Sequence, residues 1–411
     1  MKRNRKKSNR KKKVLMLASV ASMIDQFNMA NIRLLLEMGY EVHVACNFLA
    51  GNTCSKERIQ KLQQTLDKWH VVWHQWDCPR SIRPVSKCAA AFKQLQILLR
   101  VHRFAWMHCH SPVGGALARI AAHQEGARVI YTAHGFHFFR GAPVWNWLLY
   151  YPAERLLSCW SDVLIAINRE DYLLAKNRLY AKKLFYLPGV GVDTLRFQQQ
   201  GGVAVRREYR RKYGISQNAV LLLSVGELSS RKNHQAVLDA LANMGGRTCY
   251  YLICGQGALK DDLQKQAEAL GIAGRVRMPG FLEDLAGIYH AADLFVFPSR
   301  QEGLPAALME AMAAGLACVA SDIRGNRELL GTAGQAKGAG TKKQACVQPG
   351  GILYAADSRK QLVCALEYML EHPQYRASCA KYNQQRIWGY DIQAVQRRMR
   401  CIYQQMEQDG K

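Results

Sequence analysis

The feature that most constrains the fold is an alternation of short apolar runs with longer segments of helical spacing, which occurs in two series. The first series predicts strands at 14–19, 41–46, 71–76, 105–109, 129–132, 163–167 and 184–187, and the second at 220–225, 250–254, 276–278, 294–297 and 318–320. Strands that alternate with helices are typical of a parallel sheet wrapped by helices. We therefore predict an α/β chain with two doubly wound, Rossmann-like domains that face each other across a cleft.

Polar and glycine-bearing residues mark the expected domain boundary at 198–203. They separate an N-terminal domain, 14–197, from a C-terminal domain, 204–378, and both have an ordinary domain size. A basic tail is expected at 1–13 and helices at 379–411, while the composition of 331–344 predicts a mobile loop. Because ligands of doubly wound sheets bind beyond the carboxyl ends of the strands, the loops after the strands are the candidate sites.

Positive charge dominates the chain, with 57 Lys and Arg against 31 Asp and Glu and a net charge of +26. Residues 1–198 hold 30 basic and 12 acidic residues, and nine of the basic ones lie within the first thirteen positions. Such an excess suits an anionic partner, such as a membrane surface, a nucleic acid or a phosphate-bearing ligand, although a solubilising surface has the same composition.

The composition also bears on location. No apolar run approaches the roughly 20 residues that cross a bilayer. The thirteen cysteines form no Cys-x-x-Cys pair, which suits a reducing compartment. The basic start before Val14–Ala21 loosely resembles a signal peptide, but its apolar run is short and predicts a strand. We therefore expect a cytoplasmic protein.

The segment after the strand at 294–297 carries the strongest chemical signal. Glu302 and Gly303 lie in its loop, Pro305 is well placed to open a helix, and Glu310 is the only charged residue between Gly303 and Ser321. A helix start favours phosphate, and a carboxylate can accept hydrogen bonds from a ribose or a sugar ring. These residues predict a seat for a nucleotide-sugar. The alternative is that Glu310 faces water and Glu302 is an ordinary loop charge.

Two further loops offer groups for a diphosphate. Gly226 follows one strand, and Arg231 and Lys232 precede the next helix, where two cations could neutralise a leaving group. Gly255 and Gly257 follow another strand and could admit a ligand close to the backbone, although a Gly-x-Gly pair alone is a weak signal. Ordinary exposed charge is the alternative for the two cations.

Several histidines follow strands of the N-terminal half. His108 and His110 end one strand, and His134 follows the next, where it is either a polar cleft residue or a structural histidine. With Cys109 and His137 they match no standard zinc spacing, and the chain has no Asp-x-Asp pair for a metal–diphosphate complex. We therefore expect no metal and no other cofactor.

An aromatic-rich run covers residues 136–152, with seven Phe, Trp and Tyr among seventeen residues against a chain average of 9%. Aromatic side chains beside a cation such as Arg140 suit a membrane interface. The alternative is a helix that packs heavily on the sheet.

With these residues, the sequence resembles retaining glycosyltransferase family 4, of GT-B fold, over nearly the whole chain. The strongest match is Glu302 and Glu310, eight residues apart in a Glu-Gly-Leu-Pro…Glu-Ala setting. Supporting matches are Gly226 with Arg231-Lys232, Cys254-Gly-Gln-Gly257, Pro279-Gly-Phe281 and the closing helix after Trp388, which in the family crosses back onto the first domain. The segments 18–22, 108–112 and 131–137 resemble bacterial enzymes that build capsular or exopolysaccharide units on a lipid diphosphate carrier.

The resemblance implies a role for each residue. Glu310 would bind the ribose, Glu302 the hydroxyls of the donor sugar, and Lys232 with Arg231 the departing diphosphate. The implied catalytic residues are Lys232, Arg231, His134 and Glu302, with His134 beside the donor sugar. The implied nucleotide-sugar-binding residues are Gly226, Arg231, Lys232, Gly255, Phe281, Glu302, Gly303, Leu304 and Glu310.

The implied enzyme is independent of metal and retains the anomeric configuration. Its donor is expected to be a UDP-sugar, and its acceptor a lipid-diphosphate-linked saccharide at the inner face of the membrane, to which the basic N-terminal half would attach. Two departures affect the phosphate and acceptor contacts: Glu227 stands where many family members have Arg, and residues 19–22 replace a glycine pair. The sequence identifies neither the sugar nor the acceptor.

Two other functions remain open. A UDP-N-acetylglucosamine 2-epimerase uses the same fold without an acceptor, although the pair of glutamates argues against it. A basic nucleic-acid-binding protein would use the N-terminal charge, but the sequence has no helix-turn-helix, zinc-finger or RNA-binding signature, so we expect no nucleic acid.

Overall fold

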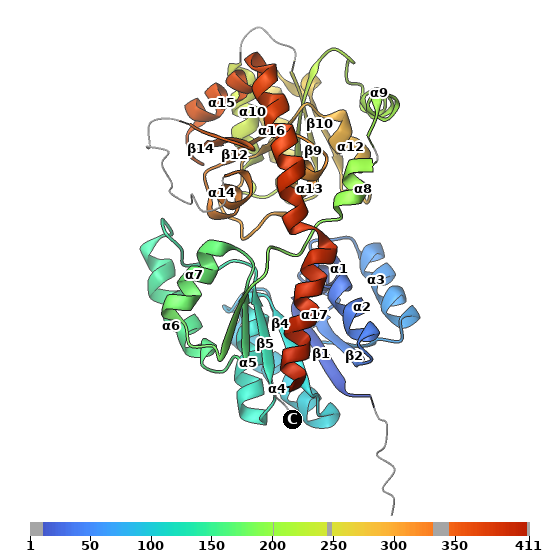
Figure 1. Ribbon diagram of the computed structural model, residues 1–411, viewed down its shortest axis with the longest axis vertical. Coiled ribbons are helices and arrows are strands. Elements are labelled where there is room, and N and C mark those ends of the chain that lie inside the picture. The colour runs from blue at the N-terminus through green and yellow to red at the C-terminus, as the bar shows by residue number, and fades with distance from the viewer. Residues whose placement is uncertain (1–10, 200, 245–248, 332–344, 409–411) are drawn as a thin grey trace, which may run out of the picture. The chain divides into compact units, whose positions relative to one another are not determined.

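The computed structural model describes residues 11–199, 201–244, 249–331 and 345–408. The chain forms two compact units, one made of residues 1–187 with 396–411 and the other of residues 188–395 (Figure 1). Most of the expected basic tail, and the expected mobile loop from 332 onward, lie outside the described residues. The chain leaves the first unit at Leu187, so that the segment 198–203 belongs to the second unit, as do residues 379–395.

The first unit is built on a seven-stranded sheet in the order β3-β2-β1-β4-β5-β6-β7, in which every pair is parallel. Its strands are β1 (Lys13–Val20), β2 (Glu41–Asn47), β3 (Val72–Gln75), β4 (Trp106–His110), β5 (Val129–Ala133), β6 (Val163–Ala166) and β7 (Lys183–Tyr186). Its helices are α1 (Ala21–Phe27), α2 (Met29–Glu37), α3 (Lys56–Lys68), α4 (Val85–His102), α5 (Pro112–Glu125), α6 (Val144–Ser158) and α7 (Arg169–Arg178). All seven predicted strands are confirmed.

The last helix, α17 (Ile392–Gln408), completes the core of this unit with its residues from Gln396 onward. The ring of Tyr403 stacks on that of Trp106 at 5.1 Å between centroids, and its hydroxyl lies 2.9 Å from Nδ1 of His108. Both faces of this sheet have to be covered by helices. In the central strand β1, which lies between β2 and β4, every residue of Val14–Val20 is buried. A strand buried on both sides reads as a continuous apolar run instead of an alternating one.

The second unit repeats the arrangement with the sheet order β10-β9-β8-β11-β12-β14-β13. Its strands are β8 (Val220–Val225), β9 (Cys249–Cys254), β10 (Val276–Gly280), β11 (Leu294–Phe297), β12 (Cys318–Ser321), β13 (Cys346–Gln348) and β14 (Gly351–Tyr354). Its helices are α8 (Thr194–Gln199), α9 (Val203–Lys212), α10 (His234–Asn243), α11 (Lys260–Ala269), α12 (Ala286–Ala291), α13 (Ala306–Ala313), α14 (Arg324–Leu330), α15 (Arg359–Glu371) and α16 (Pro373–Arg386), with short 3₁₀ turns η1 (Ala273–Arg275) and η2 (Ile387–Tyr390).

The five strands predicted for this unit are present, but the sheet has two more. β14 adds in parallel beside β12, and β13 pairs with it antiparallel at the edge. In both sheets the strand order reverses between the first strand and the fourth, at β1/β4 and at β8/β11. Such a reversal makes a crevice at the carboxyl ends of the two strands, where ligands of doubly wound folds bind. No helix of the described residues is long and apolar enough to span a membrane.

Candidate nucleotide-sugar site

The loops that follow β8 and β11 meet at the point where the second sheet reverses its strand order. Oε1 of Glu302 accepts hydrogen bonds from Nη1 of Arg231 at 2.6 Å and from Nζ of Lys232 at 2.8 Å. The side chains of Glu302 and Lys232 are each 12% exposed, and that of Arg231 is 44% exposed. The fold therefore brings together three residues that the sequence placed in two separate motifs.

The charges of this cluster determine how it titrates. Burial by itself would raise the pKa of Glu302, but the positive charges of Lys232 and Arg231 hold that pKa below its usual range. The carboxylate is therefore ionised near neutral pH and neutralises one of the two cations. Glu227 lies 3.9 Å from Arg231 on the exposed side, so the residue that departs from the family pattern contacts the cation next to it.

Glycines let the neighbouring loops pack closely. Gly226 has φ of +157°, and a Cβ on it would lie 3.1 Å from Cε of Lys232. A Cβ on Gly255 would lie 1.8 Å from the carbonyl oxygen of Gly226, and the N–H of Gly226 donates to the carbonyl of Cys254 at 3.0 Å. Gly255 is therefore required for the contact between two loops, and its contact with a nucleotide stays a prediction.

Gly303 and Leu304 lead into α13. Pro305 is the N-cap of this helix, with extended backbone, so the helix begins one residue later than predicted, at Ala306. Leu304 is buried, and Gly303 packs so closely on α14 that a Cβ on Gly325 would lie 2.4 Å from the Gly303 carbonyl oxygen. The first turn of α13 leaves N–H groups outside the helical hydrogen bonds, as the predicted phosphate seat requires.

Glu310 lies in the second turn of α13 and is partly buried. Its Oε2 accepts a hydrogen bond of 2.8 Å from the hydroxyl of Tyr289, which comes from α12. Burial raises the pKa of Glu310 to about 7, although the hydrogen bond from Tyr289 acts in the other direction. Tyr289 was not predicted, because nothing in its own segment marks it as a partner of α13. Phe281, directly after β10, is 40% exposed.

His134 belongs to the first unit and forms a line of imidazoles with two histidines of β4. Its Nε2 lies 3.0 Å from Nδ1 of His110, and Nε2 of His108 lies 2.8 Å from Oγ1 of Thr132. Burial lowers the pKa of His134 to about 4 and that of His108 to about 3, so these rings are neutral at pH 7. They are hydrogen-bonded within the fold, and the contact of His134 with a donor sugar stays a prediction.

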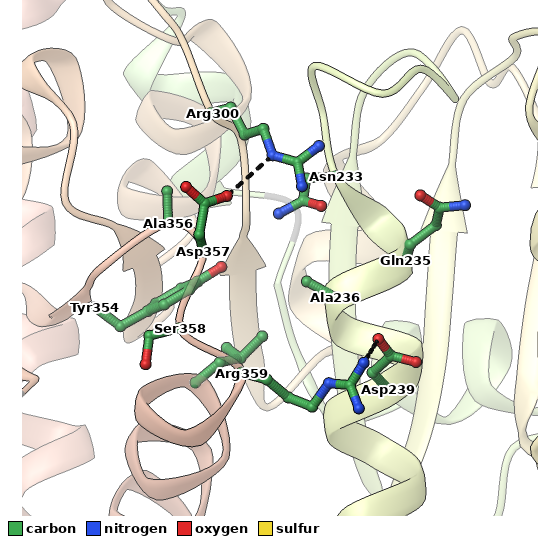
Figure 2. Close-up of a pocket in the computed structure, with 11 residues that line it drawn as sticks. Asn233, Gln235, Ala236, Asp239, Arg300, Tyr354, Ala356, Asp357, Ser358 and Arg359 are labelled. Carbon is green, nitrogen blue, oxygen red and sulfur yellow. Dashed lines mark hydrogen bonds and ion pairs between the residues drawn. The ribbon is translucent and has the colours of Figure 1, made fainter. Parts of the chain in front are cut away.

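The loop that carries Lys232 also borders a cavity of about 320 Å³ between the starts of α10 and α15 (Figure 2). Figure 2 shows Arg300 beside Asp357, at 3.3 Å, and Arg359 beside Asp239, at 2.5 Å. The backbone N–H of Arg300, a residue that lines the cavity, donates to the carbonyl of Arg231 at 2.9 Å. This hydrogen bond supports the loop that carries Arg231 and Lys232.

The aromatic run 136–152 divides between core and surface. Phe136 and Phe138 are buried, and Trp147 packs against Phe138 while its Nε1 donates to a carbonyl. α6 exposes six large apolar side chains: Val144 at 71%, Trp145 at 79%, Leu148 at 61%, Leu149 at 65%, Tyr150 at 39% and Leu156 at 58%. At 100° per residue all of these positions except Tyr150 fall on one face of the helix. One side of this segment therefore packs against the core, as the alternative predicted, and the other side is exposed to solvent.

Comparison with known proteins agrees with this architecture. Residues 205–386 match the family model described as glycosyl transferases group 1, and residues 27–184 match the model described as glycosyl transferase 4-like domain. EpsD of Bacillus subtilis, which carries a provisional glycosyltransferase name, is 36% identical over 326 residues, covering 78% of this chain and 81% of EpsD. An Escherichia coli UDP-Gal:α-D-GlcNAc-diphosphoundecaprenol α-1,3-galactosyltransferase is 30% identical over 246 residues, covering 57% of this chain and 62% of that one.

Solved structures share the fold across both units. Anabaena HepE in complex with UDP and glucose superposes with a TM-score of 0.72 at 17% identity, covering 96% of this chain and all of HepE. Sucrose-phosphate synthase from Thermosynechococcus elongatus gives a TM-score of 0.73 at 16% identity, covering 97% and 100%. At such low identity the likeness shows the fold alone, and that fold is GT-B, as expected.

Proposed function

The chain belongs to the group 1 glycosyltransferases with a family 4-like N-terminal half, and from this membership we propose that it transfers a sugar from a UDP-sugar to a lipid-diphosphate-linked saccharide, with retention of configuration, in exopolysaccharide or capsule synthesis. The observation that carries the proposal is the pairing of Glu302 with both Arg231 and Lys232 at the reversal point of the second sheet. A diphosphate needs cations, and the hydroxyls of a sugar need an acceptor beside them.

The cluster suggests how donor binding proceeds. Glu302 pairs with both cations. An arriving diphosphate would take over the charge-assisted hydrogen bonds of Arg231 and Lys232, and the released carboxylate could accept from hydroxyls of the sugar. As the bond to the sugar breaks, charge grows on the leaving phosphate, and preorganised cations stabilise that charge most strongly in the transition state. Because attack and departure would take place on one face of the sugar, the leaving phosphate could accept the proton of the acceptor hydroxyl, and the configuration would be retained.

The donor base and the acceptor are supported by relatives. HepE is seen with UDP and glucose, and the Escherichia coli galactosyltransferase is named for a UDP-sugar donor and a diphosphoundecaprenol acceptor. In this chain, the partly buried Glu310 in the second turn of α13 is suited to accept hydrogen bonds from the two hydroxyls of a ribose. This contact does not depend on the base of the nucleotide.

The exposed face of α6 supports a membrane-bound acceptor. Its acidic residue, Glu154, is turned away and pairs with the buried Arg119 through two hydrogen bonds of 2.6 and 3.0 Å. Arg155 of α6 and Arg140, just before the helix, are both exposed. The exposed charges near the apolar side chains of α6 are therefore positive. Apolar and aromatic groups with nearby cations suit the headgroup layer of an anionic membrane. We propose peripheral attachment at the inner face, through α6 and the basic N-terminal residues.

The test is product analysis by mass spectrometry with a panel of UDP-, GDP- and dTDP-sugars and a synthetic lipid-diphosphate N-acetylhexosamine. We expect transfer from one UDP-sugar, an α-linked product by NMR when the donor is α-linked, and unchanged turnover in EDTA. Loss of turnover in EDTA with rescue by Mn²⁺ would reject the metal-independent reaction.

Two outcomes would support the alternative functions instead. An epimer formed from UDP-N-acetylglucosamine alone would replace the proposal with the isomerase. Salt-sensitive binding of DNA without any sugar transfer would favour the nucleic-acid-binding protein.

A further inference from the structure

Three histidines gather in the first unit on β2, β3 and the end of α4. His43 is the third residue of β2, His74 lies on β3, and His102 is the last residue of α4, just before β4 begins. One ring nitrogen of each lies within 4.8 Å of those of the other two. Within the described ranges of the chain, this is the only group of three His, Cys, Asp or Glu side chains with such spacing.

A carboxylate orients the central ring of this group. Nε2 of His43 lies 3.1 Å from Oε1 of Glu41, and Nδ1 of His43 lies 2.9 Å from Nε2 of His74. A carboxylate only accepts hydrogen bonds, so the proton of His43 is on Nε2, and the lone pair of its Nδ1 points toward His74. Metal-binding histidines typically donate their second N–H to a carboxylate in this way. Lys13, 3.6 Å from the same carboxylate, holds Glu41 from another side.

The surroundings allow an ion to enter, and His74 would bind it through Nε2 as the Nδ1–H tautomer, which removes the proton between the rings of His43 and His74. His43 is 1% exposed, while His74 and His102 are partly exposed, so one side of the group is open to water. Ligands of a tetrahedral zinc ion at the usual Zn–N distance of about 2.0–2.1 Å are about 3.3–3.4 Å apart, so the partly exposed His102 would have to approach the other two rings by up to about 1.5 Å.

We propose that His43, His74 and His102 bind a zinc ion, with Glu41 as the group that orients His43. Neutral imidazoles favour Zn²⁺ and its neighbours Cu²⁺ and Ni²⁺ over Mg²⁺ and Ca²⁺. The ion would join β2 and β3 to the end of α4, and water would complete its coordination. Its role is structural, because it closes a long segment of the first unit and no residue of the candidate nucleotide-sugar site takes part.

The experiment is zinc titration of the full chain, purified without a histidine tag and freed of metal, by isothermal calorimetry and thermal unfolding. We expect one zinc ion per chain and a rise in Tm of about 5–10 °C at a free zinc concentration one hundred times Kd, with no effect of Mg²⁺. Glu41→Gln should raise Kd about 10–100-fold, and His102→Ala and His74→Gln should raise it further. His123→Ala removes an exposed histidine of the same unit and should leave Kd unchanged.

The variants also separate this site from other zinc-binding groups, including the thirteen cysteines. If the native chain takes up no zinc, or if His102→Ala and His74→Gln bind it as tightly as His123→Ala does, the proposal is wrong. The three rings are then a hydrogen-bonded imidazole cluster.

Discussion

Glu302 and Glu310 are carboxylates of the same unit whose surroundings shift their pKa values in opposite directions. Two cations lower the pKa of Glu302, whereas burial raises that of Glu310 to about 7. Carboxylates whose pKa values are shifted in opposite directions are suited to different functions. Glu302 is ionised near neutral pH, and Glu310 changes its charge within the physiological range.

Nucleotide binding should therefore depend on the ionisation of Glu310. Only the carboxylate accepts two hydroxyl hydrogen bonds, so the affinity for UDP should increase between pH 6 and 8 in the native chain and stay flat in Glu310→Gln. Glu310→Ala should weaken binding by about 1.5–3 kcal/mol at pH 8, the usual value of a hydrogen bond to a charged group. Calorimetry with UDP measures both effects, and Glu268→Ala, an exposed glutamate of the same unit, is the control. Equal affinity in Glu310→Ala and native protein would remove Glu310 from the site.

The same pKa predicts a change in stability. Because the folded pKa of Glu310 is above the usual value of 4.5, the folded state binds this proton more tightly than the unfolded state. The contribution of Glu310 to stability is full below about pH 4.5 and declines as the pH increases to about 7. This decline should be absent in Glu310→Gln.

Lys232 should contribute more to turnover than to donor binding. Its ammonium is 2.8 Å from Glu302 and only 12% exposed, so it faces the proposed phosphate position in a partly desolvated setting. Loss of one such group typically costs about 100–1,000-fold in kcat. We expect Lys232→Ala to show that loss with a smaller change in donor Kd, and Arg231→Ala, at the more exposed cation, to show less. A Lys232→Ala enzyme with native kcat would assign the role to Arg231 or to neither residue.

At the scale of elements, the glycines after β8 and β9 should prove to be packing residues. A Cβ on Gly255 would overlap the carbonyl oxygen of Gly226, so the two loops would have to separate. Overpacking of this kind costs about 1–3 kcal/mol, and we expect Gly255→Ala to lower the Tm of the protein before any ligand is added. Gly274→Ala is the control, since a Cβ there meets nothing within 4 Å. A Gly255→Ala protein with native Tm and weak UDP binding would instead support direct nucleotide contact.

The two tryptophans of α6 should respond differently to substitution. Trp145 is 79% exposed, so Trp145→Ala should weaken the salt-resistant binding to vesicles, while the free energy of unfolding stays within about 0.5 kcal/mol of the native value. Trp147 packs on Phe138 and Tyr151, so Trp147→Ala should destabilise the first unit. Co-sedimentation with anionic vesicles at high salt measures the first effect and thermal unfolding the second. If Trp145→Ala sediments as the native chain does, α6 does not enter the membrane.

Elements were predictable from sequence where the signal is local. Twelve strands were predicted from their apolar runs. Nine of them are central parallel strands, which are buried on both faces, and β3, β7 and β10 lie at sheet edges. β13 and β14 were not predicted. β14 begins at a glycine and is placed by its pairing with β12, and β13 has only three residues and is placed by its pairing with β14. The cluster of Glu302 with Arg231 and Lys232 could be expected, since both loops follow strands that are neighbours in the sheet. The bond from Tyr289 to Glu310, and the meeting of His43, His74 and His102, depend on tertiary packing between segments with no common motif.

For the whole molecule, the distribution of charge should control attachment to membranes. The net charge is +26, and nine basic residues lie in the first thirteen positions, mostly outside the described residues. Each basic residue near an anionic surface contributes about 1 kcal/mol at most. Deletion of residues 1–12 should weaken binding to anionic vesicles at low salt and flatten its salt dependence, while donor hydrolysis stays unchanged. An intact chain that remains in the supernatant with anionic vesicles at low salt would argue for a soluble acceptor.

The return of the chain to its first unit has a consequence for biosynthesis. Residues 1–187 leave the ribosome first, but the side chains that cover Trp106 and His108 come from Tyr403 and its neighbours in α17. Between them lies a second unit of about 200 residues, which takes about 10–40 s to translate. During that interval the nascent first unit exposes part of its apolar sheet. We therefore expect the nascent chain to bind chaperones that recognise apolar surfaces, and to be most exposed to aggregation until its last helix emerges.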